Sequence, residues 1–386
     1  MKRSTLFLAV GLLFSLAGNA QPIPFKQGDK YGYKNKATGQ VVINPIYDRV
    51  VPFSEDRALV RRQSKNYFID QDGKIKIVLE YDSVLSFSEG FAAVKKNGTW
   101  GYIDKLGLVK IKLEFPEASS FSQGMAVVKK EGRYGYIDKT GKVVIAPEYG
   151  NAFEFSNDLA AVSKDGKFGY INQKGKVVIP YAYQEAGNFM EGAAIVKKGD
   201  AYGMIDKTGK TILPVEYEWA SVFSDGLVRV QKNKKWGFAD KTGSVVIPLN
   251  FDWASDFTDG LAKVKVGNKY GFINKTGAEV IKPIYDWAED FDGNVVMVVK
   301  NGTWGALNKT GETVSPFKYR IVRPFSEERA IVIEGGKYGY IDNKGKLVIP
   351  AEYDYAYDFV NGWAEVVKDG KSTFIDLKGT CVKYCK

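Results

Sequence analysis

The side chains that could do chemistry in this sequence are carboxylates, lysines, aromatic rings and two cysteines, because the chain contains no histidine. The lack of histidine excludes Ser-His-Asp and Cys-His catalysis, histidine metal sites and the usual proton shuttle near neutral pH. The phosphate-cradling pattern Gly-x-x-x-x-Gly-Lys-Ser/Thr is also absent from the sequence. We therefore expect no metal site and no cofactor, and we look for binding by rings and charges.

The tetrapeptide Asp-Lys-Thr-Gly occurs at 138–141, 206–209 and 240–243, and it is similar to the phosphorylated motif of cation-pump ATPases. Asp accepts hydrogen bonds from nearby backbone N–H groups and Gly takes a positive φ at no cost, so we interpret these segments as hairpin turns. Two carboxylates could still meet between repeats, as they do in glycosidases. No acidic pair stands out in the sequence, so we predict that the protein is not an enzyme and keep a glycan-active hydrolase as the alternative.

Aromatic residues recur at one variable position of the sequence, at Trp219, Trp253, Trp287 and Tyr355, whose spacings are multiples of 34 residues. If repeated units stack, these rings form a row that can stack on sugar rings or anchor a protein partner. The alternative is that the rings cover the core. We refer to these four residues as the Trp column and predict that they bind a ligand.

A second position is mostly basic, and it gives the candidate binding residues Lys96, Lys130, Lys164, Lys198 and Lys232. This basic column could meet an anionic partner, and the formal net charge of +10 is compatible with one without requiring it. The alternative is that lysines at strand ends protect the sheets from edge-to-edge aggregation. Nucleic acid is not expected as a partner of an exported protein.

The elements that must position these residues are repeats, because three columns of residues recur with a period of 34 residues. A glycine recurs from Gly39 to Gly379, a phenylalanine from Phe53 to Phe359, and a Tyr or Phe ring from Tyr47 to Tyr353. Within one unit, 134–138 and 142–145 are predicted strands around a turn, and Pro147 ends the second of them. The only helical turn that the pattern allows is near 219–223.

An aromatic-glycine pair recurs in most units, for example Tyr134-Gly135 and Trp236-Gly237. A glycine inside a strand usually marks a close backbone approach or a bulge. We predict that the ring beside it packs between neighbouring repeats rather than on a ligand.

The motif Trp/Tyr-Gly-Tyr/Phe-Ile-Asp-x-x-Gly, followed by Val-Ile-x-Pro-x-Tyr and Phe-Ser-x-Gly, resembles the bacterial WG repeat, also called the KWG repeat. Lys235-Trp236-Gly237-Phe238 matches the triplet that gives the repeat its name. The resemblance implies an exported or surface-associated binding protein without a common enzymatic activity, and it offers no catalytic residue to carry over.

The fold class predicted from these patterns is all-β, with tandem 34-residue units that each form a β-hairpin or three-strand meander. We expect an open solenoid or superhelix, with a closed β-propeller as the alternative. The first unit begins on its second strand at Tyr31, and the last unit has its own first strand near Trp363. The open form is favoured because no strand at the C-terminus is available to complete the first unit.

The predicted organisation has four parts: a signal peptide at 1–20, a short lead at 21–30, about ten WG-type repeats at 31–380 and a cysteine-containing cap at 381–386. Lys2 and Arg3 precede a short apolar stretch, and small residues precede the expected cleavage before Gln21. No membrane span is expected after cleavage. Cys381 and Cys385 can bridge only if the chain turns between them, since a straight strand would hold them about 13 Å apart.

These observations together predict a non-enzymatic binding or scaffold protein of the bacterial cell envelope, which engages a protein or glycan partner through its variable positions. The expected location is the periplasm, the outer-membrane surface or the extracellular medium. A purely structural surface protein is a further alternative.

Overall fold

The computed structural model describes residues 21–291, 293–323, 325–360 and 362–385, and all regular elements in these ranges are β-strands. The predicted signal peptide, 1–20, lies outside the described residues. The chain divides into two compact units, Met1–Tyr81 and Asp82–Lys386, which we call unit 1 and unit 2 and describe separately.

Unit 1 contains two antiparallel sheets, β1-β2-β3 and β4-β5-β6-β7. Their strands are β1 (Ile23–Gln27), β2 (Lys30–Lys34), β3 (Val41–Tyr47), β4 (Arg49–Val50), β5 (Ala58–Arg62), β6 (Lys65–Ile69) and β7 (Ile75–Leu79). We number these sheets blades 1 and 2.

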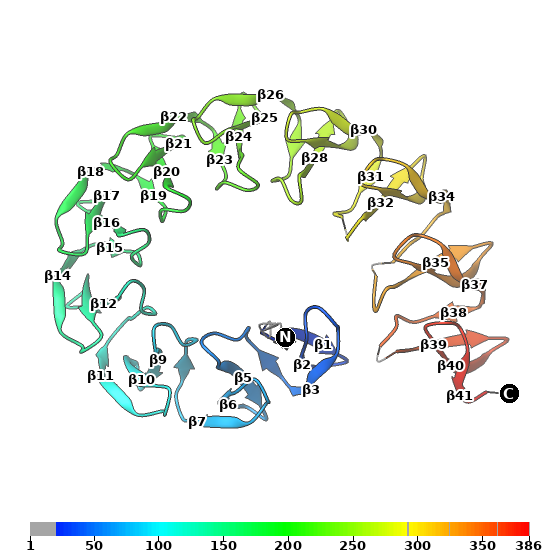
Figure 1. Ribbon diagram of the computed structural model, residues 1–386, viewed down its shortest axis with the longest axis horizontal. Helices are drawn as coiled ribbons and strands as arrows, with labels where there is room; N and C mark the ends of the chain where they lie inside the picture. The colour runs from blue at the N-terminus through cyan, green and yellow to red at the C-terminus, as the bar shows by residue number, and fades with distance from the viewer. Residues whose placement is uncertain (1–20, 292, 324, 361, 386) are drawn as a thin grey trace, which may run out of the picture. The chain divides into compact units, whose positions relative to one another are not determined.

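Unit 2 contains nine further sheets, blades 3 to 11. In each blade a short first element is followed by three longer strands in sequence order (Figure 1). The short strands are β8 (Ser83–Val84), β15 (Asn151–Ala152), β19 (Glu185–Ala186), β23 (Trp219–Ala220), β27 (Trp253–Ala254), β31 (Trp287–Ala288) and β38 (Tyr355–Ala356). In blades 4 and 10 single bridges, Ala118 to Val128 and Val322 to Val332, take the place of this short strand.

The second strand of each blade in unit 2 is β9 (Phe91–Lys96), β12 (Met125–Lys130), β16 (Leu159–Lys164), β20 (Ala193–Lys198), β24 (Val228–Lys232), β28 (Leu261–Val266), β32 (Val295–Lys300), β35 (Arg329–Glu334) or β39 (Trp363–Lys368). The third is β10 (Thr99–Asp104), β13 (Arg133–Asp138), β17 (Lys167–Asn172), β21 (Ala201–Asp206), β25 (Lys235–Ala239), β29 (Lys269–Asn274), β33 (Thr303–Asn308), β36 (Lys337–Asp342) or β40 (Lys371–Asp376). The last is β11 (Val109–Phe115), β14 (Val143–Tyr149), β18 (Val177–Tyr183), β22 (Thr211–Tyr217), β26 (Val245–Phe251), β30 (Glu279–Tyr285), β34 (Thr313–Tyr319), β37 (Leu347–Tyr353) or β41 (Cys381–Lys383).

The all-β prediction is confirmed, but the expectation of an open solenoid of three-stranded units is corrected. Most of the repeated sheets have four strands, and each is a separate sheet without strand pairing to its neighbours in the described ranges. Successive sheets of unit 2 pack side by side, with the short strand on the inner side of the arc that this unit forms (Figure 1). This is the blade architecture of a β-propeller, the alternative stated above. The fourth strand could not be predicted from the sequence, because a strand of two residues is too short to show an alternation of apolar and polar residues.

The two ends of the array also differ from the sequence predictions. The lead at 21–30 contains β1, which pairs with β2 along its full length, so the first unit does not lack its first strand. The cap at 381–386 contains β41, which pairs with β40 as the last strand of blade 11. Cys381 and Cys385 form a disulfide across a Cα–Cα distance of 5.7 Å. The helical turn allowed near 219–223 is not a helix, because Trp219–Ala220 is the strand β23.

The hairpin turns form as predicted from Asp-Lys-Thr-Gly. The Asp138 carboxylate accepts hydrogen bonds from the backbone N–H groups of Thr140 and Lys142 and from the Thr140 hydroxyl. Gly141 has a φ of 86°, which glycine adopts without strain. This explains the repetition of the motif without any phosphoryl chemistry.

The glycine of the aromatic-glycine pair marks a close backbone approach and a bulge, as predicted. The register between β13 and β14 shifts on either side of Gly135. A Cβ at Gly135 would lie 2.6 Å from the carbonyl oxygen of Ile145 and 2.7 Å from the nitrogen of Pro147. The proline sits at this bulge, where no N–H is needed for the sheet.

The hydrophobic core of unit 2 lies between adjacent blades. One representative cluster joins Tyr136, Ile145 and Tyr149 of blade 4 to Phe155 and other buried residues of blade 5. The Tyr136 and Phe155 rings are 4.9 Å apart, and the Tyr136 hydroxyl donates a 2.8 Å hydrogen bond to the backbone carbonyl of Phe153. The fully buried contact between repeats is therefore made by the ring two residues after Tyr134, while Tyr134 itself packs on this cluster only partly buried.

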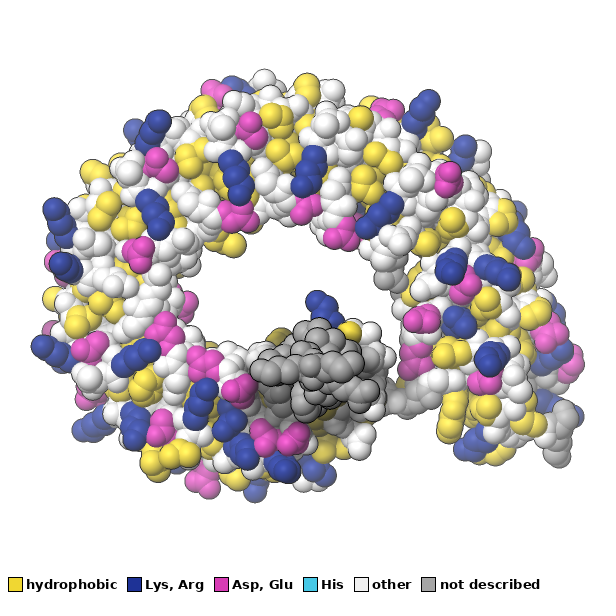
Figure 2. Space-filling view, viewed as in Figure 1, with side chains coloured by type: hydrophobic (Ala, Val, Ile, Leu, Met, Phe, Trp, Pro, Cys, Tyr) yellow, Lys and Arg dark blue, Asp and Glu magenta, His cyan; other side chains and the backbone are white. Residues whose placement is uncertain are grey.

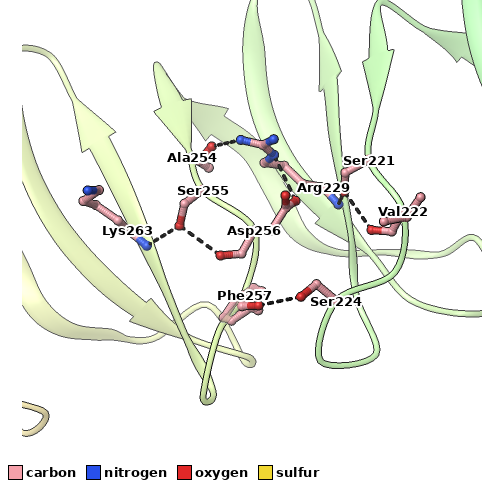
Figure 3. Close-up of polar contacts among 9 residues, drawn as sticks. All are labelled: Ser221, Val222, Ser224, Arg229, Ala254, Ser255, Asp256, Phe257 and Lys263. Carbon is pink, nitrogen blue, oxygen red and sulfur yellow. Dashed lines mark hydrogen bonds and ion pairs between the residues drawn. The ribbon is translucent and has the colours of Figure 1, made fainter. Parts of the chain in front are cut away.

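A serine hydrogen bond crosses to the next blade at several junctions of unit 2. The Ser224 hydroxyl donates to the backbone carbonyl of Phe257 at 2.7 Å (Figure 3). The same bond, 33 residues forward, is made by Ser88, Ser122, Ser156 and Ser326. At these junctions the Phe-Ser-x-Gly segment thus joins neighbouring blades at the end of the blade opposite to the Trp column.

Candidate binding face

The Trp column occupies the first residue of the short strands. Trp219, Trp253, Trp287 and Tyr355 begin β23, β27, β31 and β38. Trp253 and Trp287 are 36% and 45% exposed, and Tyr355 is 37% exposed, whereas Trp219 is less exposed. The rings are therefore not part of the buried core, and two of the three tryptophans present a large apolar surface to solvent.

These rings belong to a longer row that also includes the aromatic-glycine pairs. Across blade 8, Trp253 pairs with Lys265 and Lys265 pairs with Tyr270, so the three side chains lie on one side of the sheet. Tyr270 in turn contacts Trp287 of blade 9, with ring centroids 5.4 Å apart. In blade 7, Trp219 contacts Trp236 at the same distance of 5.4 Å.

We call Trp219, Trp236, Trp253, Tyr270 and Trp287 the aromatic face. Only the Trp column of this face was predicted from the sequence, because Trp236 and Tyr270 belong to the aromatic-glycine pairs that were interpreted as packing residues. The sequence signal that reveals the full row is a spacing of 17 residues between successive rings, which is half the repeat. Alternate rings of the row come from the short strand and from the third strand.

The equivalent positions of blades 4 and 6 are polar. Glu117 accepts hydrogen bonds from Lys129 at 2.7 Å and from the Tyr134 hydroxyl at 2.6 Å. Lys129 and, secondly, Tyr134 hold the pKa of Glu117 below its ordinary value. In blade 6, Glu185 accepts from Lys197 at 2.9 Å. The same strand positions thus carry a hydrogen-bonded polar group in one region and aromatic rings that contact one another at steep angles in the other.

A partly buried cation, Arg229, contacts two rings of the aromatic face. The Arg229 guanidinium lies 4.8 Å from the ring centroids of both Trp219 and Trp236. It also donates to the backbone carbonyl of Ala254 and forms an ion pair with Asp256 at 3.2 Å, both in blade 8 (Figure 3). The contact with Asp256 is an ion pair rather than an aligned hydrogen bond, since neither Arg229 Nε nor Asp256 Oδ1 has a hydrogen-bond partner. Burial lowers the pKa of Arg229 from its ordinary value.

Lys263 repeats this arrangement one blade further on. Its ammonium donates to the backbone carbonyl of Ala288 at 3.1 Å and to Asp290 at 2.7 Å. Most other blades of unit 2 have apolar residues at this position, among them Val127, Ala161, Ile195 and Met297, and blade 11 has Glu365. At two adjacent junctions a cation therefore lies close to the tryptophan rings, where its charge can interact with their π-electrons.

A cavity of about 680 Å³ opens between these blades, beside Trp253, Tyr270 and Trp287. Its polar lining comes from Asp252, Asp256, Asp290, Ser255, Arg229, Lys263 and Lys265. Its size is within the range of ligand sites, and its lining combines three aromatic rings with seven polar side chains. The carboxylates are engaged by cations, and the pKa of Asp252 is lowered first by its hydrogen bond from Lys235.

The basic column lies at the ends of the second strands, where Lys96, Lys130, Lys164, Lys198 and Lys232 are exposed or partly exposed. Lys164 pairs with Glu148 at 3.1 Å and Lys232 with Glu216 at 3.1 Å, and each glutamate lies on the last strand of the preceding blade. At the junction of blades 9 and 10 the charges are exchanged, since Lys318 of blade 9 pairs with Glu334 of blade 10 at 2.9 Å. Over the visible face of unit 2, Lys and Arg alternate with Asp and Glu rather than forming a basic patch (Figure 2).

No group of three or more His, Cys, Asp or Glu side chains suited to a metal ion occurs among the residues that the structure describes. In the same ranges there is no helix long and apolar enough to cross a membrane.

Known proteins resemble this chain in sequence family and in fold. A search of curated sequences found no match. Among solved structures, a eukaryotic initiation factor aligns with a TM-score of 0.48 and 10% identity, covering 75% of this chain and 93% of that one. BamB from Moraxella catarrhalis aligns with a TM-score of 0.34 and 13% identity, covering 76% and 95%. The WD40 domain of SCAP from fission yeast aligns with a TM-score of 0.30 and 10% identity, covering 84% and 93%. All three scores are below 0.5, and no argument here depends on these structures.

The family described as WG containing repeat matches ten segments of the sequence: 31–65, 68–100, 100–134, 134–168, 168–200, 202–236, 236–270, 270–304, 304–338 and 338–371. These segments cover most of the chain, and most of their boundaries fall on the aromatic-glycine pairs. The chain therefore belongs to the WG containing repeat family.

Proposed function

We propose that the protein is a non-catalytic binding protein that acts outside the cytoplasm and holds a protein or glycan partner on its aromatic face. The observation that carries this proposal is the exposure of Trp253 and Trp287, which are 36% and 45% accessible beside a cavity of about 680 Å³. A partner that covers a large exposed ring gains free energy by removing its apolar area from water, and rings of this kind dominate the binding energy of many interfaces.

The polar lining of the cavity supports binding rather than hydrolysis. A glycosidase needs one carboxyl group that is protonated near neutral pH. Here Asp256 and Asp290 form ion pairs with Arg229 and Lys263. The hydrogen bond from Lys235 lowers the pKa of Asp252, which favours its ionised form. If the mature protein released reducing ends from envelope or dietary polysaccharides, this part of the proposal would be wrong.

The basic column contributes less to the proposal than it did from the sequence alone. Lys164 and Lys232 are each paired with a glutamate of the preceding blade, so they do not form an unpaired anion-binding surface. We therefore assign the partner's main contact to the aromatic face and leave to Lys96, Lys130 and Lys198 at most a contribution to long-range attraction.

Action outside the cytoplasm is proposed from the N-terminal sequence, where Lys2 and Arg3 precede an apolar stretch. The disulfide between Cys381 and Cys385 supports it, because such bonds persist in oxidising compartments. N-terminal sequencing of the protein from the envelope fraction should find a chain that begins near Gln21. Recovery of the uncut chain from the cytoplasm would contradict the proposed location.

The binding test changes Trp253 and Trp287 to Ala in the mature protein, and then adds Trp219→Ala. The matched control replaces the equivalent residues of two polar blades, Asn151→Ala and Glu185→Ala. Partners are first identified with a glycan array and a pull-down from envelope extract, and affinities are then measured by calorimetry. We expect the Trp253→Ala/Trp287→Ala variant to bind at least about tenfold more weakly, since two stacking contacts are lost.

The control variant should retain its affinity within about twofold. Near-UV circular dichroism and the thermal midpoint establish that both variants are folded. If the folded tryptophan variant binds every identified partner as tightly as the unchanged protein, the aromatic face is not the binding site.

A further inference from the structure

A cavity opens at the same place of three junctions in unit 2, and the three cavities differ in their lining. At the junctions of blades 4 and 5, 8 and 9, and 9 and 10 they measure about 380, 680 and 360 Å³. Tyr134, Tyr270 and Trp304 occupy one equivalent lining position in them. The blade architecture therefore creates the cavity, and the side chains that line it decide which ligand it can take.

The cavity between blades 8 and 9 has a lining whose formal charges cancel. Three cations and three carboxylates line it: Arg229, Lys263, Lys265, Asp252, Asp256 and Asp290. Arg229 forms an ion pair with Asp256 at 3.2 Å (Figure 3). Lys263 forms one with Asp290 at 2.7 Å. A ligand with a net charge of either sign therefore gains no net attraction from this lining.

The charged groups of this lining keep hydrogen-bonding capacity that a ligand with hydroxyl groups can use. The Asp290 side chain is 88% exposed, and one of its oxygens accepts from the Lys263 ammonium at 2.7 Å. A carboxylate has about four acceptor sites on its two oxygens, so Asp290 can accept further hydrogen bonds. The side chains of Asp252 and Asp256 are 38% and 41% exposed. A hydroxyl both donates and accepts, so it can take the place of water at carboxylates and ammonium groups alike.

The rings of the cavity place apolar surface beside these polar groups. Trp253 and Trp287 are 36% and 45% exposed. The Trp287 indole N–H already donates to Glu289 at 2.9 Å, so this ring offers a ligand only its carbon surface. A sugar ring has C–H faces and a rim of hydroxyl groups. It therefore matches a wall in which exposed aromatic rings and hydrogen-bonding groups lie together.

The other two cavities do not have this combination. Between blades 4 and 5 the positions of Trp253 and Trp287 are occupied by Glu117 and Asn151. Between blades 9 and 10 the position of Lys263 is occupied by Met297, and that of Trp287 by Ile321, which lies outside the lining.

The same charges make the cavity between blades 8 and 9 unfavourable for the apolar anchor of a protein partner. Such an anchor would remove water from the ion pairs of Arg229 and Lys263 without replacing its hydrogen bonds, and this costs binding free energy. An uncharged ligand that carries hydroxyl groups replaces the water that it removes, so the lining favours a glycan over a protein.

We propose that the partner held on the aromatic face is a neutral oligosaccharide, whose sugar rings lie against Trp253 and Trp287 and whose hydroxyl groups bond to Asp290 and Lys265. This inference rests on the proposed function and narrows its partner from a protein or a glycan to an uncharged glycan. Because the ligand carries no charge, its affinity should be almost independent of ionic strength.

The test uses the mature protein and calorimetry, with maltohexaose, cellohexaose, xylohexaose, mannohexaose and N-acetylchitohexaose as neutral probes and hexagalacturonate as the anionic one. We expect saturable binding of at least one neutral probe, with a dissociation constant that changes by less than about twofold between about 50 and 500 mM NaCl. Hexagalacturonate should bind at least about tenfold more weakly, because its carboxylates would lose hydration without finding unpaired cations.

Two variants and one control connect this binding to the cavity. Trp253→Ala/Trp287→Ala should weaken the neutral probe by at least about tenfold, and Asp290→Ala by about fivefold through loss of a hydroxyl acceptor. Glu154→Ala changes the residue of blade 5 that is equivalent to Asp290, so it is the matched control and should keep the affinity within about twofold. Near-UV circular dichroism establishes that all three variants are folded.

The outcomes separate this inference from the proposed function. The inference is wrong if no neutral probe saturates a site, if hexagalacturonate binds more tightly than all of them, or if the folded tryptophan variant binds the neutral probe unchanged. An Asp290→Ala variant that binds as well as Glu154→Ala overturns the assigned hydroxyl contact. If the neutral probes fail while a partner from the envelope pull-down loses affinity in Trp253→Ala/Trp287→Ala, the proposed function stands without the glycan. Both fail if that partner binds the tryptophan variant unchanged.

Discussion

Blades 4 and 6 and blades 7 to 9 use the same backbone positions for different chemistry. In blades 4 and 6, Glu117 and Glu185 are held by a lysine and lie beside a tyrosine, which satisfies the carboxylates locally. In blades 7 to 9 the same short-strand position carries Trp219, Trp253 and Trp287, whose rings are exposed in two of the three cases. A polar group that is already bonded gives a partner little to gain, whereas an exposed ring gives it apolar area to cover.

The comparison also shows which features the two regions share. The glycine bulge and the turn hydrogen bonds are the same in both, and so is the serine bond to the next blade wherever the residue is serine. The short strand is fixed by its backbone pairing with the second strand, so its first side chain can vary without cost to the fold. Function can therefore be placed at this position blade by blade, while the scaffold stays constant.

The largest expected loss of stability comes from adding a Cβ at the glycine bulge, and it should be equal in the two regions. Gly135→Ala and Gly237→Ala each push a Cβ to 2.6 Å from a carbonyl oxygen of the last strand, and that backbone must shift to admit it. We expect each to destabilise its blade by about 3 kcal/mol, as measured by native-state hydrogen exchange. Gly124→Ala, which meets open space at a φ of 82°, is the control and should cost about 1 kcal/mol. A smaller loss at Gly135 than at Gly124 would refute the bulge argument.

The next largest loss of stability comes from breaking the ion pair of Arg229 with Asp256, and it should occur only in the aromatic region. Asp256→Ala leaves the Arg229 side chain, 14% exposed, without its carboxylate, and we expect a loss of about 2 kcal/mol. Arg229→Met introduces the residue that blade 9 has as Met297, so it should cost under about 1 kcal/mol. Thermal unfolding of both variants and of the double variant measures this. If Arg229→Met is as damaging as Asp256→Ala, the arginine stabilises the junction by more than charge pairing.

A smaller loss of stability is expected when the serine that bonds to the next blade is changed to alanine. The loss should depend on whether a second side chain donates to the same carbonyl. Ser122→Ala and Ser224→Ala each remove a bond to the next blade and should cost about 1 kcal/mol. Ser156→Ala should cost clearly less, because the Asn157 amide also donates to the Phe189 carbonyl at 2.8 Å. Hydrogen exchange of the affected junctions resolves the three variants, and an equal loss in all of them would contradict this explanation.

The smallest expected effect is the acid sensitivity of the hairpins. The Thr140 hydroxyl, followed by backbone N–H groups, holds the pKa of Asp138 below its ordinary value. A carboxyl with a lowered folded-state pKa stabilises the protein above its unfolded pKa, and this contribution disappears as the pH falls below about 4. Asp138→Asn, the residue that blade 5 has as Asn172, should make this hairpin insensitive to acid. Hydrogen exchange between pH 2 and 6 tests this, and an unchanged acid profile in the variant would count against it.

Much of the scaffold could be predicted from the sequence because its residues repeat in a fixed phase. The turn at 138–141 and the bulge at Gly135 each follow from a local requirement that only a few residue types meet. The fourth strand could not be predicted, since Trp219–Ala220 is held by pairing with β24 and not by its own pattern. The strand β1 was missed because Pro24 and its short length hide its alternation.

Only part of the candidate site could be predicted from the sequence, and the part that was missed includes Trp236 and Tyr270. Constant columns were treated as packing and variable columns as function, but a ring of a constant column can meet a ring of a variable one across a junction. Arg229 and Lys263 were missed for a different reason, because charged residues in a strand usually face solvent and only the neighbouring blade makes them partly buried.

The serine bond at an offset of 33 residues has a consequence for how such chains change over generations. Each serine is donated by one repeat and accepted by the next, so the bond spans the boundary between two copies rather than lying within one. An unequal crossover that removes or duplicates one whole 34-residue period joins a donor repeat to an acceptor repeat again. The number of blades can therefore change by recombination while every junction keeps the same type of contact. A ring or a cation at a variable position is gained or lost together with the repeat that carries it.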